Sequence, residues 1–139
     1  MPQHRFRMEL TCRYQRPDNT PVELAVRNRA DGEWQEFVLG FQTPGFQSFV
    51  YAILNCQHLY MRTNAAERGL LLESSKGIVD VAADERWLLQ KVHVHFEARL
   101  ASGEPAPGDV DYIVERMGRC PVSVNLRKPQ DTLTTLTLS

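Results

Sequence analysis

Apolar and polar residues alternate strictly at the start of the chain. Over residues 5–16 the apolar side chains fall on one side and the charged ones on the other, and this period of two predicts a half-buried strand. The same period predicts strands over residues 22–29 and 34–41, joined by a PDNTP turn and by a hairpin turn at residues 30–32. Together these segments predict an antiparallel meander.

The pattern changes after Pro44. Residues 45–68 predict one long helix, with Thr43 as a cap, Pro44 in its first turn and Gly69 closing its C-terminal end. At 1.5 Å per residue this helix would be roughly 35 Å long. Because apolar residues wrap most of its first two-thirds, we expect it to be buried in a core or in an oligomer interface.

The second half of the chain predicts two strands, a helix and a strand. The strands cover residues 70–84 and 88–100, with a possible bulge or bend at Lys76 and Gly77. Asp109 is the predicted N-cap of a helix over residues 110–119, and alternating Leu and Thr predict a final strand over residues 132–139. The order β-β-β-α-β-β-α-β indicates an α+β fold with a mostly antiparallel sheet.

Composition narrows the classes of protein. A length of 139 residues, 42% hydrophobic and 24% charged, fits a single domain over residues 1–139. The net charge of -1 gives no electrostatic reason to expect a nucleic-acid or membrane partner. No run approaches the ~18 apolar residues of a membrane span, and the N-terminus lacks a signal-peptide pattern, so a cytoplasmic location is expected.

The three cysteines have different surroundings. Cys12 lies on the apolar face of the first strand, and Cys56 lies within the long apolar helix, where cysteine often acts as a small hydrophobe. Cys120 follows Arg116 and Arg119 and precedes a proline, a setting that can favour a reactive thiolate, although a buried cysteine at a helix end is equally compatible. No CxxC spacing occurs, so we expect no structural metal and no cofactor.

Two segments carry a family resemblance. The helix FVYAILNCQHLYMR, followed by AAERG, and the later segment RMGRCPVSVNL each contain one cysteine, in register with the predicted element order. Together they resemble the two cysteine segments of the OsmC/Ohr proteins, the osmotically inducible and organic hydroperoxide resistance proteins, over residues 43–126. The resemblance implies an intertwined homodimer in which two central helices pack together and six-stranded sheets wrap around them.

The resemblance also implies a peroxidase mechanism. The Cys56 thiolate would attack the O–O bond of an organic hydroperoxide, leaving an alcohol and a cysteine sulfenic acid. Cys120 would then condense with the sulfenic acid to form a disulfide, which an external dithiol reductant would reduce. For that disulfide to close, the two Cβ atoms must come within about 4.5 Å.

Peroxidases of this family also use a glutamate and an arginine, and the match departs from the family at both. The TPGFQSF segment has no carboxylate, and Gln47 is its nearest polar substitute. The arginine has four candidates in the N-terminal meander: Arg13, Arg16, Arg27 and Arg29. Gln47, Arg13 and Arg16 are the residues we name as possible supporting residues. Without a nearby cation, the pKa of the Cys56 thiol would be raised.

Other interpretations remain open. His93 and His95 share a strand face at a spacing that suits a metal, but a solvent-facing pair explains them as well. His58 is a weak candidate for a base, because residues two apart on a helix do not face each other. An alternative function is a non-catalytic dimer of the same fold that binds a small apolar ligand or a partner near Cys56.

Overall fold

The computed structural model describes residues 4–30, 32–126 and 131–139. The elements are, in order, β1 (His4–Gln15), β2 (Thr20–Ala30), β3 (Glu33–Glu36), α1 (Gly45–Glu67), β4 (Leu71–Ala83), β5 (Leu89–Ser102), α2 (Asp109–Met117), the short 3-10 helix η1 (Ser123–Asn125) and β6 (Asp131–Leu138). This confirms the predicted β-β-β-α-β-β-α-β order. Neither helix of the described ranges is long and apolar enough to cross a membrane.

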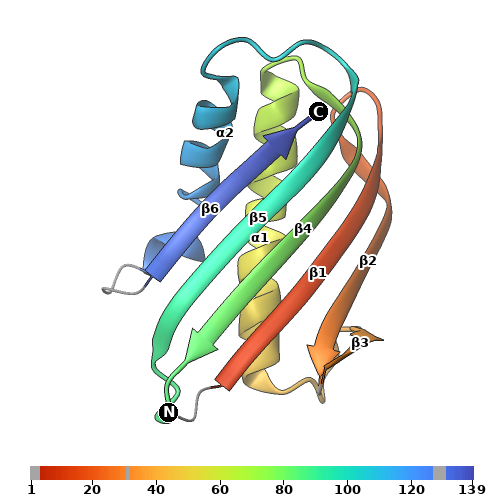
Figure 1. Cartoon of the computed structure of the whole chain (residues 1–139). Helices are drawn as coiled ribbons and strands as arrows, with labels where there is room; N and C mark the ends of the chain where they lie inside the picture. The colour runs from red at the N-terminus through yellow and green to blue at the C-terminus, as the bar shows by residue number, and fades with distance from the viewer. Residues whose placement is uncertain (1–3, 31, 127–130) are drawn as a thin grey trace.

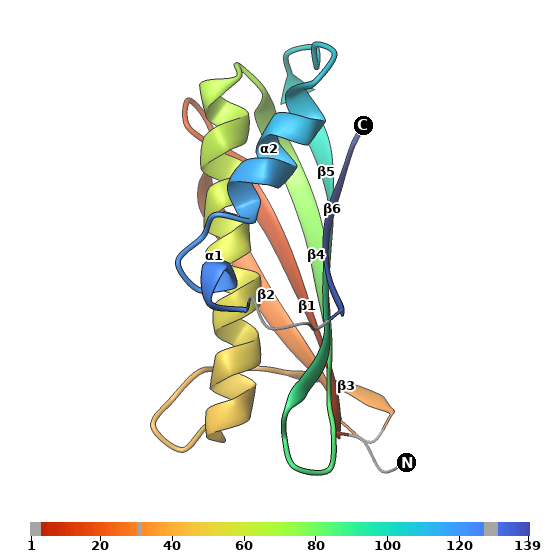
Figure 2. The ribbon, with the colours of Figure 1, turned by 90° about the vertical axis from the view of Figure 1, so that its left-hand side faces the viewer.

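The six strands form one mixed sheet in the order β3-β2-β1-β4-β5-β6 (Figure 1). All neighbouring strands are antiparallel except β5 and β6, so the expectation of a mostly antiparallel sheet is confirmed. The parallel pair is possible because α2 crosses between the two strands. Both helices lie on the same side of the sheet, which leaves two layers and one sheet face without a helix (Figure 2).

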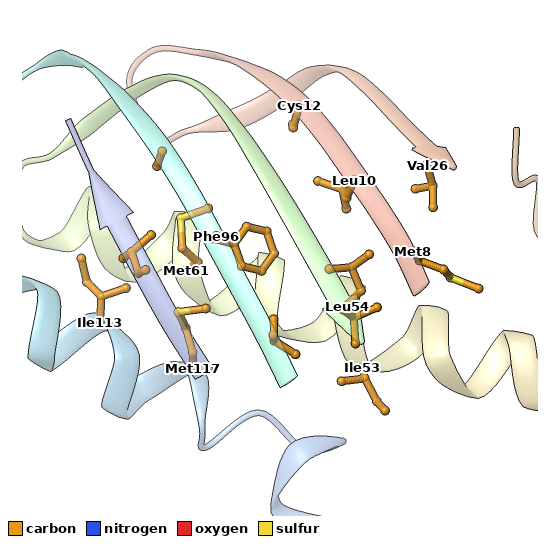
Figure 3. Packing of buried hydrophobic residues seen from close by; sticks show 14 of the residues in the cluster. Met8, Leu10, Cys12, Val26, Ile53, Leu54, Met61, Phe96, Ile113 and Met117 are labelled. Atoms are coloured by element: carbon orange, nitrogen blue, oxygen red, sulfur yellow. The ribbon is translucent and has the colours of Figure 1, made fainter. Parts of the chain in front are cut away.

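The core lies between α1 and the sheet. One stripe of α1 is buried, at the spacing of three and four residues that defines a helix face: Val50, Ile53, Leu54, Gln57, His58, Met61, Asn64 and Ala65. The apolar members of this stripe pack with Met8 and Leu10 of β1 and Phe96 of β5 (Figure 3). Leu59 points elsewhere and is 42% exposed, so within one chain the helix is buried on one side only.

The N-terminal end of α1 differs from the prediction, whereas the C-terminal end agrees with it. The N-cap is Pro44, with no side-chain hydrogen bond; Thr43 does not cap the helix, because its Oγ1 accepts a hydrogen bond from the Gly40 N–H at 2.9 Å. At the other end Gly69 has φ +74°. Its N–H donates to Ala66 and the following N–H donates to Ala65, which is the Schellman arrangement expected of a glycine that closes a helix.

Two further boundaries are corrected. β3 ends at Glu36 rather than at residue 41. The Phe37 N–H makes one more hydrogen bond to the Val26 carbonyl at 2.9 Å, and the Phe37 ring packs against Tyr51 at 5.6 Å where the chain turns toward α1. The prediction of Asp109 as an N-cap is wrong, since Gly108 holds that position and Asp109 is the first helical residue. The Asp109 Oδ2 instead accepts a hydrogen bond from the Ala106 N–H at 2.7 Å.

The predicted irregularity at Gly77 is also wrong. Gly77 pairs regularly with Phe96, and the register shifts of β4 against β5 lie near the two ends of the pair. A Cβ atom on Gly77 would lie 2.3 Å from the Phe96 ring. Glycine is therefore required here by the close approach of an aromatic ring and not by a bulge.

Candidate active site

The structure brings Cys56 and Cys120 together from distant parts of the chain. Cys56 lies on α1, and Cys120 follows α2, where its N–H bonds the Met117 carbonyl at 3.2 Å. The two thiols lie near enough for Cys120 to affect the pKa of Cys56, and both cysteines are free. Cys120 is fully buried, whereas Cys56 is only partly so, so Cys56 is the more accessible thiol of the pair.

The surroundings of Cys56 favour its protonated form. Burial raises the pKa of the Cys56 thiol to about 11, and the hydrogen bond and the charge of Cys120 act in the same direction. A hydrogen bond from the Val122 backbone opposes them in part. Cations within the described ranges are not among these contributions, and this is the case for which the sequence predicts a raised pKa of Cys56.

A chain of hydrogen bonds holds Cys120 in place. Its Sγ accepts from the Ser123 N–H at 3.2 Å and lies 3.0 Å from the Ser123 Oγ. The Gln57 amide donates to that Oγ at 2.8 Å, and Thr134 of β6 donates to the Gln57 Oε1 at 3.1 Å. Sequence reasoning missed Gln57 and Ser123; the available signal was a polar residue inside the buried stripe of α1, directly after Cys56.

A small cavity of about 130 Å³ adjoins these hydrogen bonds. It is bordered by α1, β5, β6 and the segment after α2, through Gln57, Val92, Gly118, Ser123, Leu126, Thr132, Leu133 and Thr134. Because Gln57 and Ser123 border the cavity and also hold Cys120, a small molecule in it would lie close to the cysteine pair.

The predicted supporting residues lie away from the cysteines of their own chain. Gln47 precedes Cys56 by nine residues, about two and a half helical turns, so the two point to opposite sides of α1. Arg13 lies on the sheet face opposite the helices and forms an exposed ion pair with Glu23 at 2.8 Å. Arg16 lies in the exposed β1–β2 turn. A supporting role for these residues therefore remains a prediction that needs a second copy of the chain.

The two remaining arginine candidates also lie on the open sheet face. Arg27 pairs with Glu9, with its Nε 3.1 Å from the carboxylate. The Arg29 guanidinium lies 5.8 Å from the centre of the Trp34 ring. Both side chains therefore have partners on the side of the sheet away from Cys56.

His58 belongs to the core. It is 1% exposed, and its Nε2 lies 2.7 Å from the Tyr14 hydroxyl, which in turn lies 2.5 Å from the Ser75 Oγ. Burial, and then the charge of Arg62, lowers the pKa of His58 to about 3, so the ring is neutral at physiological pH. Its only polar contact among the described residues is on the side of the sheet, which does not suit a base acting on Cys56.

The other candidates have structural surroundings. Cys12 is 3% exposed in the core, as predicted. His93 and His95 lie on the open sheet face, where the His93 Nε2 is 2.9 Å from Asp131 and the His95 Nε2 is 3.8 Å from Glu97. Within the described ranges, no group of three or more histidine, cysteine or acidic residues is placed to hold a metal ion.

Comparison with known proteins yields matches in structure only. No family model matches the chain, and no curated protein matches it in sequence.

Solved OsmC-like structures match most of the chain. An OsmC-like protein from Mycoplasma pneumoniae matches with a TM-score of 0.57 and 11% identity, over 82% of this chain and 88% of that one. An OsmC-like hydroperoxide resistance protein from a Jannaschia species matches with a TM-score of 0.57 and 14% identity, over 91% of this chain and 89% of that one. An OsmC-like protein of unknown function from Vibrio cholerae matches with a TM-score of 0.52 and 15% identity, over 81% of this chain and 83% of that one. The chain therefore has the OsmC-like fold, at low sequence identity to the solved proteins that share it.

Proposed function

We propose that this chain is a divergent OsmC-like protein that reduces organic hydroperoxides through Cys56 and Cys120. The observation that carries the proposal is the proximity of two free thiols, which α1 and the segment after α2 bring near each other. The Jannaschia protein is named as a hydroperoxide resistance protein, and that name applies to the Jannaschia protein itself. Its shared fold makes the same chemistry a reasonable hypothesis for this chain.

The proposed reaction divides the work between the two thiols. Cys56 loses its proton, and the thiolate attacks one oxygen of the O–O bond; the bond breaks, and the alkoxide takes up a proton to leave as an alcohol. Cys56 is now a sulfenic acid. The Cys120 thiol attacks its sulfur, water leaves, and a disulfide forms. An external dithiol reduces this disulfide, becomes oxidised itself, and restores both thiols.

The protein would act as a homodimer. The side of α1 turned away from the sheet carries apolar residues that the chain itself does not cover, such as Leu59 at 42% exposure. A second copy packed on this face would bury them. It would also supply the polar and cationic groups near Cys56 that one chain does not bring there.

A second candidate function is favoured by the raised pKa of Cys56. A thiol that stays protonated reacts slowly with peroxides, because the thiolate is the nucleophile. The same dimer would then bind a small apolar ligand or a partner beside Cys56 without chemistry, and binding would survive Cys56→Ser.

Thiol titration after addition of cumene hydroperoxide separates these functions. The peroxidase predicts rapid loss of two thiols in the parent, no rapid loss in Cys56→Ser, and a trappable sulfenic acid in Cys120→Ser. Cys12→Ser is the matched control, because it removes a buried thiol outside the pair and should leave the rapid loss intact. Thiols that persist in the parent would reject the peroxidase and favour the ligand-binding alternative.

A further inference from the structure

The open face of the sheet contains a pocket of about 300 Å³ near the start of β1. This face is turned toward the viewer in Figure 1, with both helices behind it. The charged residues that line the pocket are four cations and one acid: Arg5, Arg7, Arg29, Lys91 and Asp80. The pocket lies on the other side of the sheet from the cysteine pair, so its role is independent of the proposed peroxidase.

Strand register explains why this surface is hollow. Ala82 of β4 lies opposite Arg5 on one side and opposite Lys91 on the other. The Ala82 methyl group is short and 6% exposed, whereas both neighbours are long and charged. The short side chain therefore forms a floor between long cationic side chains, an arrangement that focuses positive potential into the hollow.

The pocket has a larger excess of cations over acids than the adjacent row of side chains. In the adjacent row Glu9 is 5% exposed and bonds Arg27 and also Lys76, the latter at 3.2 Å. In the pocket, Asp80 is the one acid among the described lining residues, and it lies 3.4 Å from the Arg7 Nε. That Nε is buried and makes no hydrogen bond to any described residue.

Three of the cations are placed to receive a ligand. Arg7 and Arg29 lie next to each other, because each is the residue beyond the last β1–β2 pair, Met8 and Asn28. Lys91 faces them across Ala82. Arg5 also lines the pocket but already has an interaction partner. Such crowding of like charges is unfavourable without an anion between them.

We infer that this pocket binds a small, multiply charged anion, with phosphate groups as the best-matched chemistry. Arginine guanidinium groups bind phosphate oxygens through paired N–H donors, and a lysine adds a compact charge. The volume is at the lower end of the range for small-ligand sites. The ligand would lie between the cationic side chains and offset their mutual repulsion.

Calorimetric titration of the whole chain with inorganic pyrophosphate at low ionic strength tests this site. Arg7→Gln and Lys91→Gln are expected to weaken binding about tenfold each, because each removes a charge-assisted hydrogen bond. Asp80→Asn should tighten binding several-fold, since it removes the acid that competes for Arg7. A gain of affinity from a lost carboxylate is not expected from a variant that merely misfolds.

Arg99→Gln is the matched control. Arg99 lies on the same strand and face as Lys91, outside the pocket, in an exposed ion pair with Glu73 at 3.9 Å, and its loss should leave pyrophosphate affinity unchanged. If Arg99→Gln weakened binding as much as Lys91→Gln, or if Asp80→Asn failed to strengthen it, the pocket would not be the site. Citrate that binds as tightly as pyrophosphate would overturn the assignment of phosphate chemistry.

Discussion

Gln57 and His58 are consecutive buried residues of α1 whose side chains turn toward different parts of the sheet. The Gln57 amide bonds Ser123 and Thr134, whereas the His58 ring meets the Tyr14 hydroxyl. A polar group buried without a partner would cost about 1–3 kcal/mol, and both side chains avoid this cost through these hydrogen bonds. The pair therefore joins α1 to the cysteine segment on one side and to the middle of the sheet on the other.

Cys56 should show the pH dependence of a thiol with a raised pKa. Below its pKa of about 11, each added pH unit increases the thiolate fraction about tenfold. Alkylation of Cys56 by iodoacetamide should therefore accelerate about tenfold per unit from pH 7 to pH 9, as followed by mass spectrometry of the Cys56 peptide. A rate that levels off below pH 8 would contradict the raised pKa.

Cys120→Ala provides a second test of the same group. The Cys120 thiol raises the pKa of Cys56 through a hydrogen bond and a charge, so its removal should lower that pKa and speed the alkylation of Cys56 at pH 8. Cys12→Ala is the control, because Cys12 does not contribute to the pKa of Cys56. An unchanged rate in Cys120→Ala would show that the two thiols do not interact in solution.

Among the secondary-structure elements, β4 and β5 depend on one close contact. The Phe96 ring occupies the space above Gly77 and stacks on the His58 ring with centroids 5.8 Å apart. One aromatic side chain thus links β4, β5 and α1. Because protein cores are closely packed, the ring has little room to move if Gly77 gains a side chain.

Gly77→Ala should reduce the free energy of unfolding by about 1–3 kcal/mol, the usual cost of overpacking a core. Urea unfolding measures this loss. Phe96→Leu should cost less free energy of unfolding in the Gly77→Ala background than in the parent, because only there does it also relieve a clash. Additive losses would show that Phe96 is not the cause.

Gly45→Ala is the matched control for this prediction. Gly45 is the first residue of α1, and a Cβ atom there would meet nothing within 4 Å. Because alanine favours helix more than glycine does, this variant should be neutral or more stable by up to ~1 kcal/mol. A loss as large as that of Gly77→Ala would mean that glycine replacement itself, and not the contact with Phe96, destabilises the protein.

The whole molecule has two faces of different character. The open sheet face carries pairs of charged residues, such as Arg13 with Glu23 and Arg7 with Asp80. On the helix side, Leu59 projects from α1 into solvent, and Leu24 of β2 is 43% exposed on the face that packs against α1 elsewhere. Apolar side chains left uncovered on one side are typical of an interaction surface.

If the proposed homodimer forms through the helix side, Leu59→Glu should shift it to monomer. The introduced charge would have to be buried without a partner, which is costly. Sedimentation velocity measures the change. Leu133→Glu is the matched control, because Leu133 has a similar exposure of 49% but lies on the open sheet face. A monomeric parent, or equal effects of the two variants, would reject this interface.

Several features of this protein follow from the sequence by itself. The period of two in β1 and β5, the apolar run of α1 and the glycine that closes it are local signals, because side-chain direction and backbone conformation depend on neighbouring residues. Local signals were less reliable at ends. Thr43 and Asp109 suit a cap, yet hydrogen bonds with nearby loop residues decided their roles.

The tertiary structure alone decided which distant residues meet. The resemblance named Cys56 and Cys120, but their contact depends on how α2 packs against α1, and the link through Gln57 to Ser123 depends on the same packing. The approach of Phe96 to Gly77 and the cationic hollow around Ala82 depend on strand register. Periodicity assigns each residue to a face, whereas register and helix packing select its neighbours, because those neighbours come from segments far away in the chain.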